Sequence, residues 1–360
     1  MSDKIKNIIV SISFGLILVI VFCFNIISKD KDISISERRK LATFPEFSVS
    51  NLFNGTFFSI FDKYAVDQFV IRDNIRENKV KLDLLIKNSY HDIYKYNDYL
   101  IKMEYPLNEG SLKNLTNRIN IISDKYLSNS KIFYSVVPDK NYFVNNGNLK
   151  IDYDLLISKI NSELNNYNYI DIMNILSLED YYYSDSHYKQ ENIVKVANEI
   201  LDKMGNNYKD INYNVQNIGK FKGVYSYQVP INVKEDYINI LSNNYIDRAS
   251  VYDNLSNSYI EVYDKSKINS YDLYDIYLGG AKGLITINNN LIDSDKELVV
   301  FRDSFGSSLI PLLISSYKKI VVIDTRYISS NILSDYVDFK GQDVLFLYSV
   351  STINNSYTLK

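Results

Sequence analysis

The sequence of 360 residues contains one cysteine, two histidines and no tryptophan. The single cysteine, Cys23, excludes an intrachain disulfide and a metal site made of clustered cysteines. A net charge of −3 gives no indication of a nucleic-acid partner. The sequence also lacks a glycine-rich phosphate loop, so it implies no bound nucleotide, and we expect neither a cofactor nor a metal.

Apolar and aromatic residues are abundant instead. Hydrophobic residues make up 46% of the chain, which includes 33 tyrosines and 17 phenylalanines. This share predicts a sizeable hydrophobic core, and the length suits one large domain or two smaller ones. The accompanying abundance of asparagine, lysine and isoleucine fits an AT-rich genome, so the individual tyrosines are not interpreted as sugar-binding platforms.

Residues 8–27, IIVSISFGLILVIVFCFNII, form a long apolar run. As an α-helix this run would be about 30 Å long, which is enough to cross a bilayer. Lys4 and Lys6 precede it, so we expect a single-pass anchor in the cell membrane, with the body outside the cytoplasm. No small-x-small cleavage site is recognisable, and Cys23 lies between phenylalanines, where a lipoprotein signal needs small residues. The alternative is a buried helix of a soluble protein.

A second apolar stretch covers residues 298–317, LVVFRDSFGSSLIPLLISSY. It predicts a strand, a tight turn that holds Ser304, and a helix from about Gly306. At the carboxyl end of a strand, a serine hydroxyl is exposed where α/β proteins place their sites, and the helix N-terminus favours developing negative charge. A serine that merely caps the helix would give the same pattern.

Asp185 and His187 lie in the stretch YYYSDSHYKQEN. A catalytic serine needs a base, and the base needs a group that fixes its tautomer. On a turn before a helix predicted over 189–204, Asp185 could bond the Nδ1 atom of His187. The helix dipole would then favour a neutral imidazole. The alternative is a surface turn with a capping aspartate.

These stretches resemble the DHHW family and, through it, the SGNH-hydrolase-like proteins of alginate acetylation. In that family an Asp-x-His motif precedes a DSF motif. Here the two motifs are Asp185-Ser186-His187-Tyr188 and Asp303-Ser304-Phe305. The likeness extends over nearly the whole chain after the first 30 residues. Further similar stretches are SISERRKLATFPEF (34–47), GTFFSIFDKYAVDQFVIR (55–72), VVPDK (136–140), YLGGAKG (277–283), IDTRY (323–327) and DVLFLYSVSTINNS (343–356).

The sequence departs from the family pattern at three positions. Tyr188 replaces the family's tryptophan, which is expected to alter the packing beside the histidine without changing the chemistry. Ser186 replaces the middle histidine. Arg302 replaces the glycine of the usual SGNH G-D-S motif, which leaves open how an oxyanion site is built. The candidates for oxyanion or substrate contacts are Gly279, Gly280, Arg302 and Arg326, and a plain turn is the alternative for the two glycines.

The resemblance implies a membrane-anchored serine acyltransferase that O-acetylates an exported or cell-surface polysaccharide. Ser304 would attack an acyl carbonyl, His187 would take its proton, and Asp185 would orient His187. A membrane-bound O-acyltransferase partner that supplies the acetyl group is also implied. One alternative is a carbohydrate acetylesterase with the same triad. The other is a non-catalytic glycan-binding or export-complex scaffold on a hydrolase-like fold.

Other polar residues have structural interpretations. Asp67, Arg72 and Asp73 lie near the end of an amphipathic helical pattern and are expected to form ion pairs at its surface. His91 lies in an aromatic, hairpin-like stretch that contains no nucleophile, so it is interpreted as structural.

Apolar strands, among them those predicted over 132–137, 298–301, 320–324 and 344–348, alternate with amphipathic helices from about residue 108. This order predicts an α/β fold with a mainly parallel sheet flanked by helices, and the resemblance implies that it is SGNH-hydrolase-like. We expect residues 1–30 to form a cytoplasmic tip and transmembrane anchor, 31–105 a linker and helical region, and 106–360 the α/β domain. Within that domain, residues from about 206 to 292 are expected to form an antiparallel β insertion over the sheet.

Overall fold

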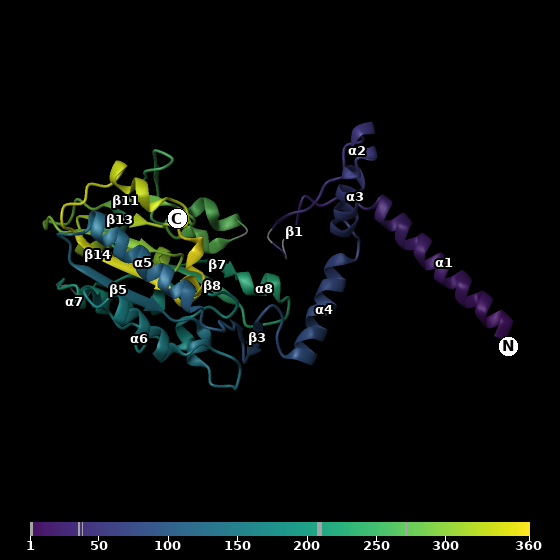
Figure 1. Ribbon diagram of the computed structural model, residues 1–360, viewed down its shortest axis with the longest axis horizontal. Coiled ribbons are helices and arrows are strands. Elements are labelled where there is room, and N and C mark those ends of the chain that lie inside the picture. Colours follow the sequence, from purple (N-terminus) through teal and green to yellow (C-terminus); the bar gives the residue numbers. More distant parts are fainter. Residues whose placement is uncertain (1–2, 35–36, 38, 207–210, 271) are drawn as a thin grey trace. The chain divides into compact units, whose positions relative to one another are not determined.

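The computed structural model describes residues 3–34, 37, 39–206, 211–270 and 272–360 (Figure 1). The chain divides into two compact units. The first, called the N-terminal unit, comprises Met1–Tyr90 and Tyr227–Ile231. The second, called the α/β unit, comprises His91–Ser226 and Asn232–Lys360.

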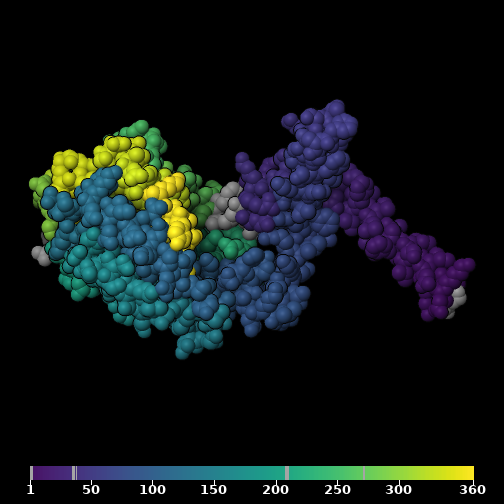
Figure 2. Space-filling model, viewed as in Figure 1, coloured from purple at the N-terminus to yellow at the C-terminus, as the bar shows by residue number. Residues whose placement is uncertain are grey.

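The N-terminal unit begins with α1 (Asp3–Ile27), a helix of 25 residues none of which is buried. Figure 2 shows the side chains of this helix uncovered on the face in view. At 1.5 Å per residue the helix is about 37 Å long. It is long and apolar enough to cross a membrane, and it confirms the helix predicted over 8–27. On which side of a membrane the body lies stays a prediction.

Ion pairs join the segments that follow α1. Asp67 accepts two bonds from the Arg39 guanidinium, at 2.5 and 2.8 Å. Asp73 pairs with Lys31 at 3.0 Å, and Arg72 pairs with Glu37. The structural interpretation of Asp67, Arg72 and Asp73 is therefore confirmed. These pairs involve the strand β2 (Arg39–Lys40) and the helices α3 (Thr56–Asp67) and α4 (Arg72–Lys87). The unit also contains the strand β1 (Ile33–Ser34) and the helix α2 (Val49–Phe53).

An eight-stranded sheet forms the centre of the α/β unit, in the order β10-β9-β11-β13-β12-β14-β5-β6. The five strands from β13 to β6 run parallel to one another, and β11, β9 and β10 continue the sheet with antiparallel pairs. The predicted mainly parallel α/β sheet is confirmed. The strands are β5 (Ile132–Val137), β6 (Asn168–Tyr169), β9 (Ser250–Asp253), β10 (Ser258–Ile260), β11 (Leu284–Asn288), β12 (Glu297–Arg302), β13 (Lys319–Ile323) and β14 (Asp343–Ser349).

Helices cover both faces of this sheet. Strand β12 illustrates why the strands of the sheet are apolar along their whole length. Leu298 and Val300 belong to the core on one face, with α7 (Val194–Lys203), α10 (Gly306–Leu309) and the 3-10 helix η6 (Ile310–Ser316). Val299 and Phe301 belong to the core on the other face, with α5 (Glu109–Tyr126), α6 (Tyr153–Glu163) and α11 (Val350–Asn354). Because successive side chains point to opposite faces, a strand covered on both sides reads as a continuous apolar run.

The predicted insertion over 206–292 is antiparallel in its described part, but its place differs from the expectation. Among the strands that the structure describes in this segment, β7 (Asn214–Phe221) and β8 (Asp236–Ser242) form a separate two-stranded sheet. Strands β9, β10 and β11 instead extend the edge of the central sheet through β13. Thus three strands of this segment lengthen the central sheet. The remaining elements of the unit include the hairpin β3 (Ile93–Tyr96) and β4 (Tyr99–Lys102) and the short helix α9 (Asn244–Asp247). Residues of the short helix α8 (Val224–Gln228) belong to both units.

Candidate active site

Ser304 lies in a tight turn directly after β12, and its side chain is partly exposed. The turn is closed by a bond from the Gly306 N–H to the Asp303 carbonyl at 3.1 Å. The Asp303 carboxylate accepts the Phe305 N–H at 3.1 Å and the Ser349 N–H at 2.7 Å. Asp303 therefore joins the carboxyl ends of β12 and β14 and fixes the turn that presents Ser304.

The Asp185–His187 segment is a narrow loop that returns on itself. Tyr181 and Tyr188 form an antiparallel bridge, and the Tyr182 N–H donates to the His187 carbonyl at 3.1 Å. The Tyr181 hydroxyl donates to the Pro138 carbonyl at 2.6 Å, just beyond the end of β5. After β12 the chain continues into β13, its neighbour on one side in the sheet, whereas after β5 it continues into β6, its neighbour on the other side. Both segments thus meet at the carboxyl ends of strands near a topological switch point, where open α/β sheets place ligand sites.

The three predicted side chains form a continuous chain of hydrogen bonds. The His187 Nδ1 atom lies 2.6 Å from Asp185 Oδ1, and His187 Nε2 lies 2.8 Å from Ser304 Oγ. Ser304 and His187 are 117 residues apart in the sequence. The structure therefore brings the three residues together in the arrangement that a serine nucleophile, its base and an orienting carboxylate require. A catalytic role for them stays a prediction.

Asp185 is buried, yet every contact around it favours its ionised form. Burial by itself would raise the pKa of Asp185. The charge of His187 and hydrogen bonds from its ring and its backbone N–H act against burial, and the Val224 N–H adds a bond at 2.8 Å. Together they hold the pKa of this carboxyl well below its usual range. An ionised Asp185 keeps the Nδ1 proton of His187 in place and leaves Nε2 facing Ser304.

The prediction of a helix over 189–204 is wrong for the first turn. A 3-10 helix covers Gln190–Asn192, and α7 begins only at Val194. His187 consequently lies seven residues before α7 and not at its N-terminus, so the helix-dipole argument for a neutral imidazole does not apply. Gln190 accounts for the break, because its side chain accepts the Leu241 N–H at 2.8 Å and donates to the Ser308 carbonyl at 2.8 Å.

A buried lysine and a buried aspartate hold the loop that carries Asp185. The Lys140 ammonium donates to the Tyr182 and Tyr183 carbonyls at 3.0 and 3.3 Å. Asp236 accepts the Ser184 N–H at 2.8 Å and the Ser184 hydroxyl at 2.7 Å. Burial lowers the pKa of Lys140 to about 7, against the opposing charges of Asp185 and Asp236. The position of Lys140 just past β5 was visible in the sequence, whereas nothing in the sequence pointed to Asp236.

Gly223 is packed directly against the same loop. Its N–H donates to Ser184 Oγ at 2.9 Å. A Cβ atom at this position would overlap Asp185 Cβ and the backbone carbonyl of Ser184. The glycine thus permits a close approach that a larger residue would prevent.

Tyr188, at the position of the family's tryptophan, lies between the two segments of the site. Its side chain is fully buried, and its hydroxyl donates to the Phe305 carbonyl at 2.8 Å. Its ring meets the Phe305 ring edge to face, with the ring centres 5.2 Å apart. Tyr188 therefore fills space beside the histidine and ties the His187 loop to the Ser304 turn.

The four remaining candidates form a structural cluster of their own. Arg302 is 1% exposed, and its guanidinium contacts Asp324, the Asp303 carbonyl and the Gly280 carbonyl at 3.3 to 3.4 Å. Arg326 binds the same Asp324 carboxylate through two bonds of 2.9 and 2.7 Å. Gly279 and Gly280 have φ angles of 69° and 76°, which a left-handed turn requires. Oxyanion or substrate contacts by these four residues stay predictions.

Two other observations concern binding sites. Within the described residues, no group of three or more histidine, cysteine, aspartate or glutamate side chains is arranged to hold a metal ion.

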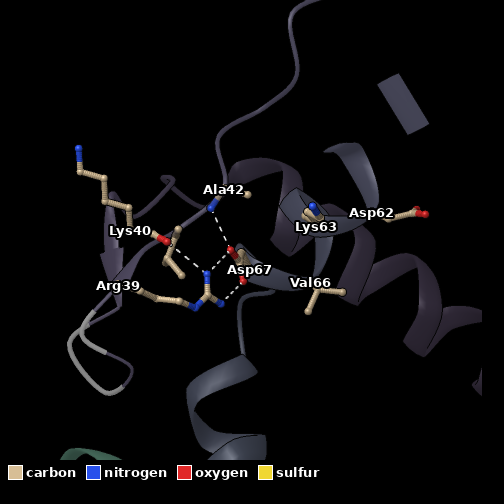
Figure 3. A pocket seen from close by; sticks show the side chains of 8 residues that line it. Arg39, Lys40, Ala42, Asp62, Lys63, Val66 and Asp67 are labelled. Atoms are coloured by element: carbon tan, nitrogen blue, oxygen red, sulfur yellow. Dashed lines mark hydrogen bonds and ion pairs between the residues drawn. The ribbon is translucent and has the colours of Figure 1, made fainter. Parts of the chain in front are cut away.

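A groove of about 560 Å³ in the N-terminal unit is shown in Figure 3. Its lining includes the Arg39–Asp67 pair and none of the three residues Asp185, His187 and Ser304. The lining residues are Arg39, Lys40, Leu41, Ala42, Asp62, Lys63, Val66 and Asp67.

No protein-family model and no curated protein sequence matches this chain. Solved structures do match. A DHHW family protein from Eubacterium siraeum superposes with a TM-score of 0.58 at 18% sequence identity, over 75% of this chain and 94% of that protein. PatB1 from Bacillus cereus, solved with a sulfonyl adduct, gives 0.59 at 15% identity, over 72% and 95%. The resemblance to the DHHW family that the motifs indicated is therefore confirmed at the level of the fold.

Proposed function

We propose that this protein is a serine O-acyltransferase that transfers acetyl groups to an exported or cell-surface polysaccharide. The observation that carries the proposal is the hydrogen-bonded series Asp185–His187–Ser304, with distances of 2.6 and 2.8 Å. The partly exposed Ser304 lies at the end of the series, so an acyl donor can reach it.

The reaction follows from the roles that these atoms can take. Ser304 Oγ attacks the acyl carbonyl while His187 Nε2 accepts its proton, and Asp185 stabilises the imidazolium that forms. The tetrahedral intermediate then collapses, the leaving group takes the proton from His187, and the acetyl group remains on Ser304. A sugar hydroxyl attacks this acyl-enzyme after giving its proton to His187. The acetylated sugar is released, and Ser304 regains the proton.

The choice of acetyl and polysaccharide rests on the resemblance to the DHHW family and to the SGNH-hydrolase-like proteins of alginate acetylation. The sulfonyl adduct of PatB1 supports a reactive nucleophile on this fold, since sulfonyl groups attach to nucleophilic side chains. Because the acetyl group must cross the membrane, the proposed partner is a membrane-bound O-acyltransferase. In this scheme α1 anchors the protein, and the α/β unit acts outside the cytoplasm.

Two other functions use the same fold. A carbohydrate acetylesterase has the same triad and passes the acetyl group to water. A non-catalytic scaffold would bind glycan or organise an export complex. The hydrogen-bonded alignment of all three side chains favours an enzyme, because a scaffold does not require an ionised aspartate, an imidazole and a serine hydroxyl in series.

A burst experiment separates these functions. The full-length protein in detergent, mixed with a chromogenic acetyl ester, is expected to release about one equivalent of alcohol in a fast phase before a slower steady state. Mass spectrometry should find the acetyl group, or the adduct of an aryl sulfonyl fluoride, on the peptide that contains Ser304. An acceptor oligosaccharide should speed the slow phase of a transferase and leave that of an esterase unchanged. A scaffold would give neither a burst nor an adduct.

The proposed localisation has a separate test. The full-length protein is expected in the membrane fraction, because α1 is long and apolar enough to cross a membrane. Protease added to intact cells, with the outer wall made permeable, should degrade the α/β unit, and lysed cells serve as the control. Full protection in intact cells together with degradation after lysis would reverse the proposed orientation.

A further inference from the structure

Tyr274 lies in the 3-10 helix η5 (Leu273–Ile276), and its ring covers one face of the His187 imidazole. The two ring centres are 3.9 Å apart, and the ring planes differ by 10°. The Phe305 ring approaches the same imidazole, with its centre 4.8 Å away and a tilt of 54°. The His187 side chain is consequently 13% exposed.

The hydroxyl of Tyr274 reaches the turn that carries the nucleophile. It lies 2.9 Å from Ser308 Oγ and 3.3 Å from the Ser304 carbonyl oxygen. Burial raises the pKa of Tyr274 well above its ordinary value. The phenol therefore keeps its proton and can donate it to one of these two oxygens. One side chain therefore contacts both the base and the backbone of the residue that carries the nucleophile.

The stacking of the Tyr274 ring on the His187 imidazole matters because the bonds of His187 to Asp185 and Ser304 both lie in the plane of the imidazole. Rotation of the imidazole about its Cβ–Cγ bond would turn Nδ1 away from Asp185 and Nε2 away from Ser304. A flat ring packed at 3.9 Å prevents that rotation, since the edge of the imidazole would collide with the phenol face. The same face also attracts a cation, so it favours the imidazolium that forms when Ser304 gives up its proton.

We propose that Tyr274 is a positioning residue that locks the plane of the His187 imidazole through its ring, so that the bonds to Asp185 and Ser304 persist together. The kinetic part of this inference rests on the proposed function, whereas the structural part does not. Nothing in the sequence indicated the role, because Tyr274 is one of 33 tyrosines and is 87 positions (274 minus 187) away from His187.

The test compares Tyr274→Phe, which keeps the ring, with Tyr274→Leu and Tyr274→Met, which remove it. In the full-length protein, the Nδ1–H of a histidine held by a carboxylate gives a proton NMR signal far downfield, and the chain has only two histidines. A His91→Gln variant assigns the signal to His187. We expect Tyr274→Phe to retain the signal and Tyr274→Leu and Tyr274→Met to lose it through exchange with water.

The kinetic readout should follow the same division. The value of kcat for acetyl-ester turnover should change by less than about threefold in Tyr274→Phe and fall by about 10- to 100-fold in the Leu and Met variants, with KM nearly unchanged. Tyr317→Leu is the matched control. It removes an equally buried ring that lies before β13, at the opposite ends of the strands, so its His187 signal should persist.

Each outcome decides the inference. A His187 signal and a kcat that persist in a folded Leu or Met variant would reduce Tyr274 to ordinary core packing. Loss of the signal in Tyr274→Phe would assign the effect to the hydroxyl bond and overturn the role of the stack. If the wild type shows no turnover but the His187 signal is retained in Tyr274→Phe and lost in the Leu and Met variants, the proposed function fails and the positioning role stands.

Discussion

Replacing Ser304 with alanine is expected to lower acetyl-ester turnover by about 10³-fold or more, because the attacking oxygen is removed. His187→Ala removes the atom that lies 2.8 Å from that oxygen and takes its proton, so its loss should be of similar size. Asp185→Asn should also be severe, since an amide in this position can hold the wrong imidazole tautomer. The losses should not add in double variants, because the three side chains act as one unit.

The control for this series is His91→Ala. His91 is exposed at the turn before β3, and it is the other histidine of the chain. Its replacement should leave turnover near the wild-type value. All four variants should fold, as none of the changes leaves a large core cavity, and thermal unfolding would show this.

The same variants decide the direction of transfer in cells. Polysaccharide from cells with Ser304→Ala should contain less acetate than polysaccharide from wild-type cells. Unchanged acetate and unchanged ester turnover would contradict the enzymatic proposal and favour the scaffold. An increase in surface acetate, with ester turnover present in the wild type, would make the protein an esterase.

Gly223→Ala is expected to damage the site although it replaces none of the three residues Asp185, His187 and Ser304. The new Cβ would overlap Asp185 Cβ and the Ser184 carbonyl, and a backbone group cannot swing aside. The loop must therefore move, and a displacement of roughly 1 Å at a catalytic group can lower kcat about 100-fold. Overpacking of this kind also lowers the free energy of unfolding by about 1–3 kcal/mol. Steady-state kinetics and urea unfolding measure the two effects.

Gly110→Ala is the matched control for this substitution. Its Cβ would lie 2.8 Å from the hydroxyl of Tyr357, a side chain that is 61% exposed and can turn away. Because Gly110 lies in the first turn of α5, alanine should leave kcat unchanged and raise the free energy of unfolding by up to about 1 kcal/mol. Wild-type kcat in Gly223→Ala would show that the loop tolerates the displacement and is not rigidly held.

The sequence was sufficient for the elements whose environment is uniform along their length. The run over 8–27 is apolar on every side, and it forms a helix with no buried residue. The strand predicted over 132–137 is β5 (Ile132–Val137), and those at 298–301, 320–324 and 344–348 correspond to β12, β13 and β14 within one or two residues. All four strands are covered on both faces, so a continuous apolar run is the direct mark of their burial. Ser304 was indicated by its place in a turn between an apolar strand and a helix, and Asp185 and His187 by their spacing before a helix. The resemblance then added the order of the two motifs.

The tertiary structure decided everything that depends on pairing between distant segments. Short β patterns over 206–292 did not reveal that β9, β10 and β11 extend the central sheet, since any strand edge offers the same backbone groups. The first turn expected at 189 is replaced by the long-range bonds of Gln190, which local helical periodicity cannot register. Tyr274, Asp236 and Gly223 are unremarkable in the sequence. Their contacts with the His187 loop exist only after the chain has folded, because that loop is 36 or more residues away from each of them.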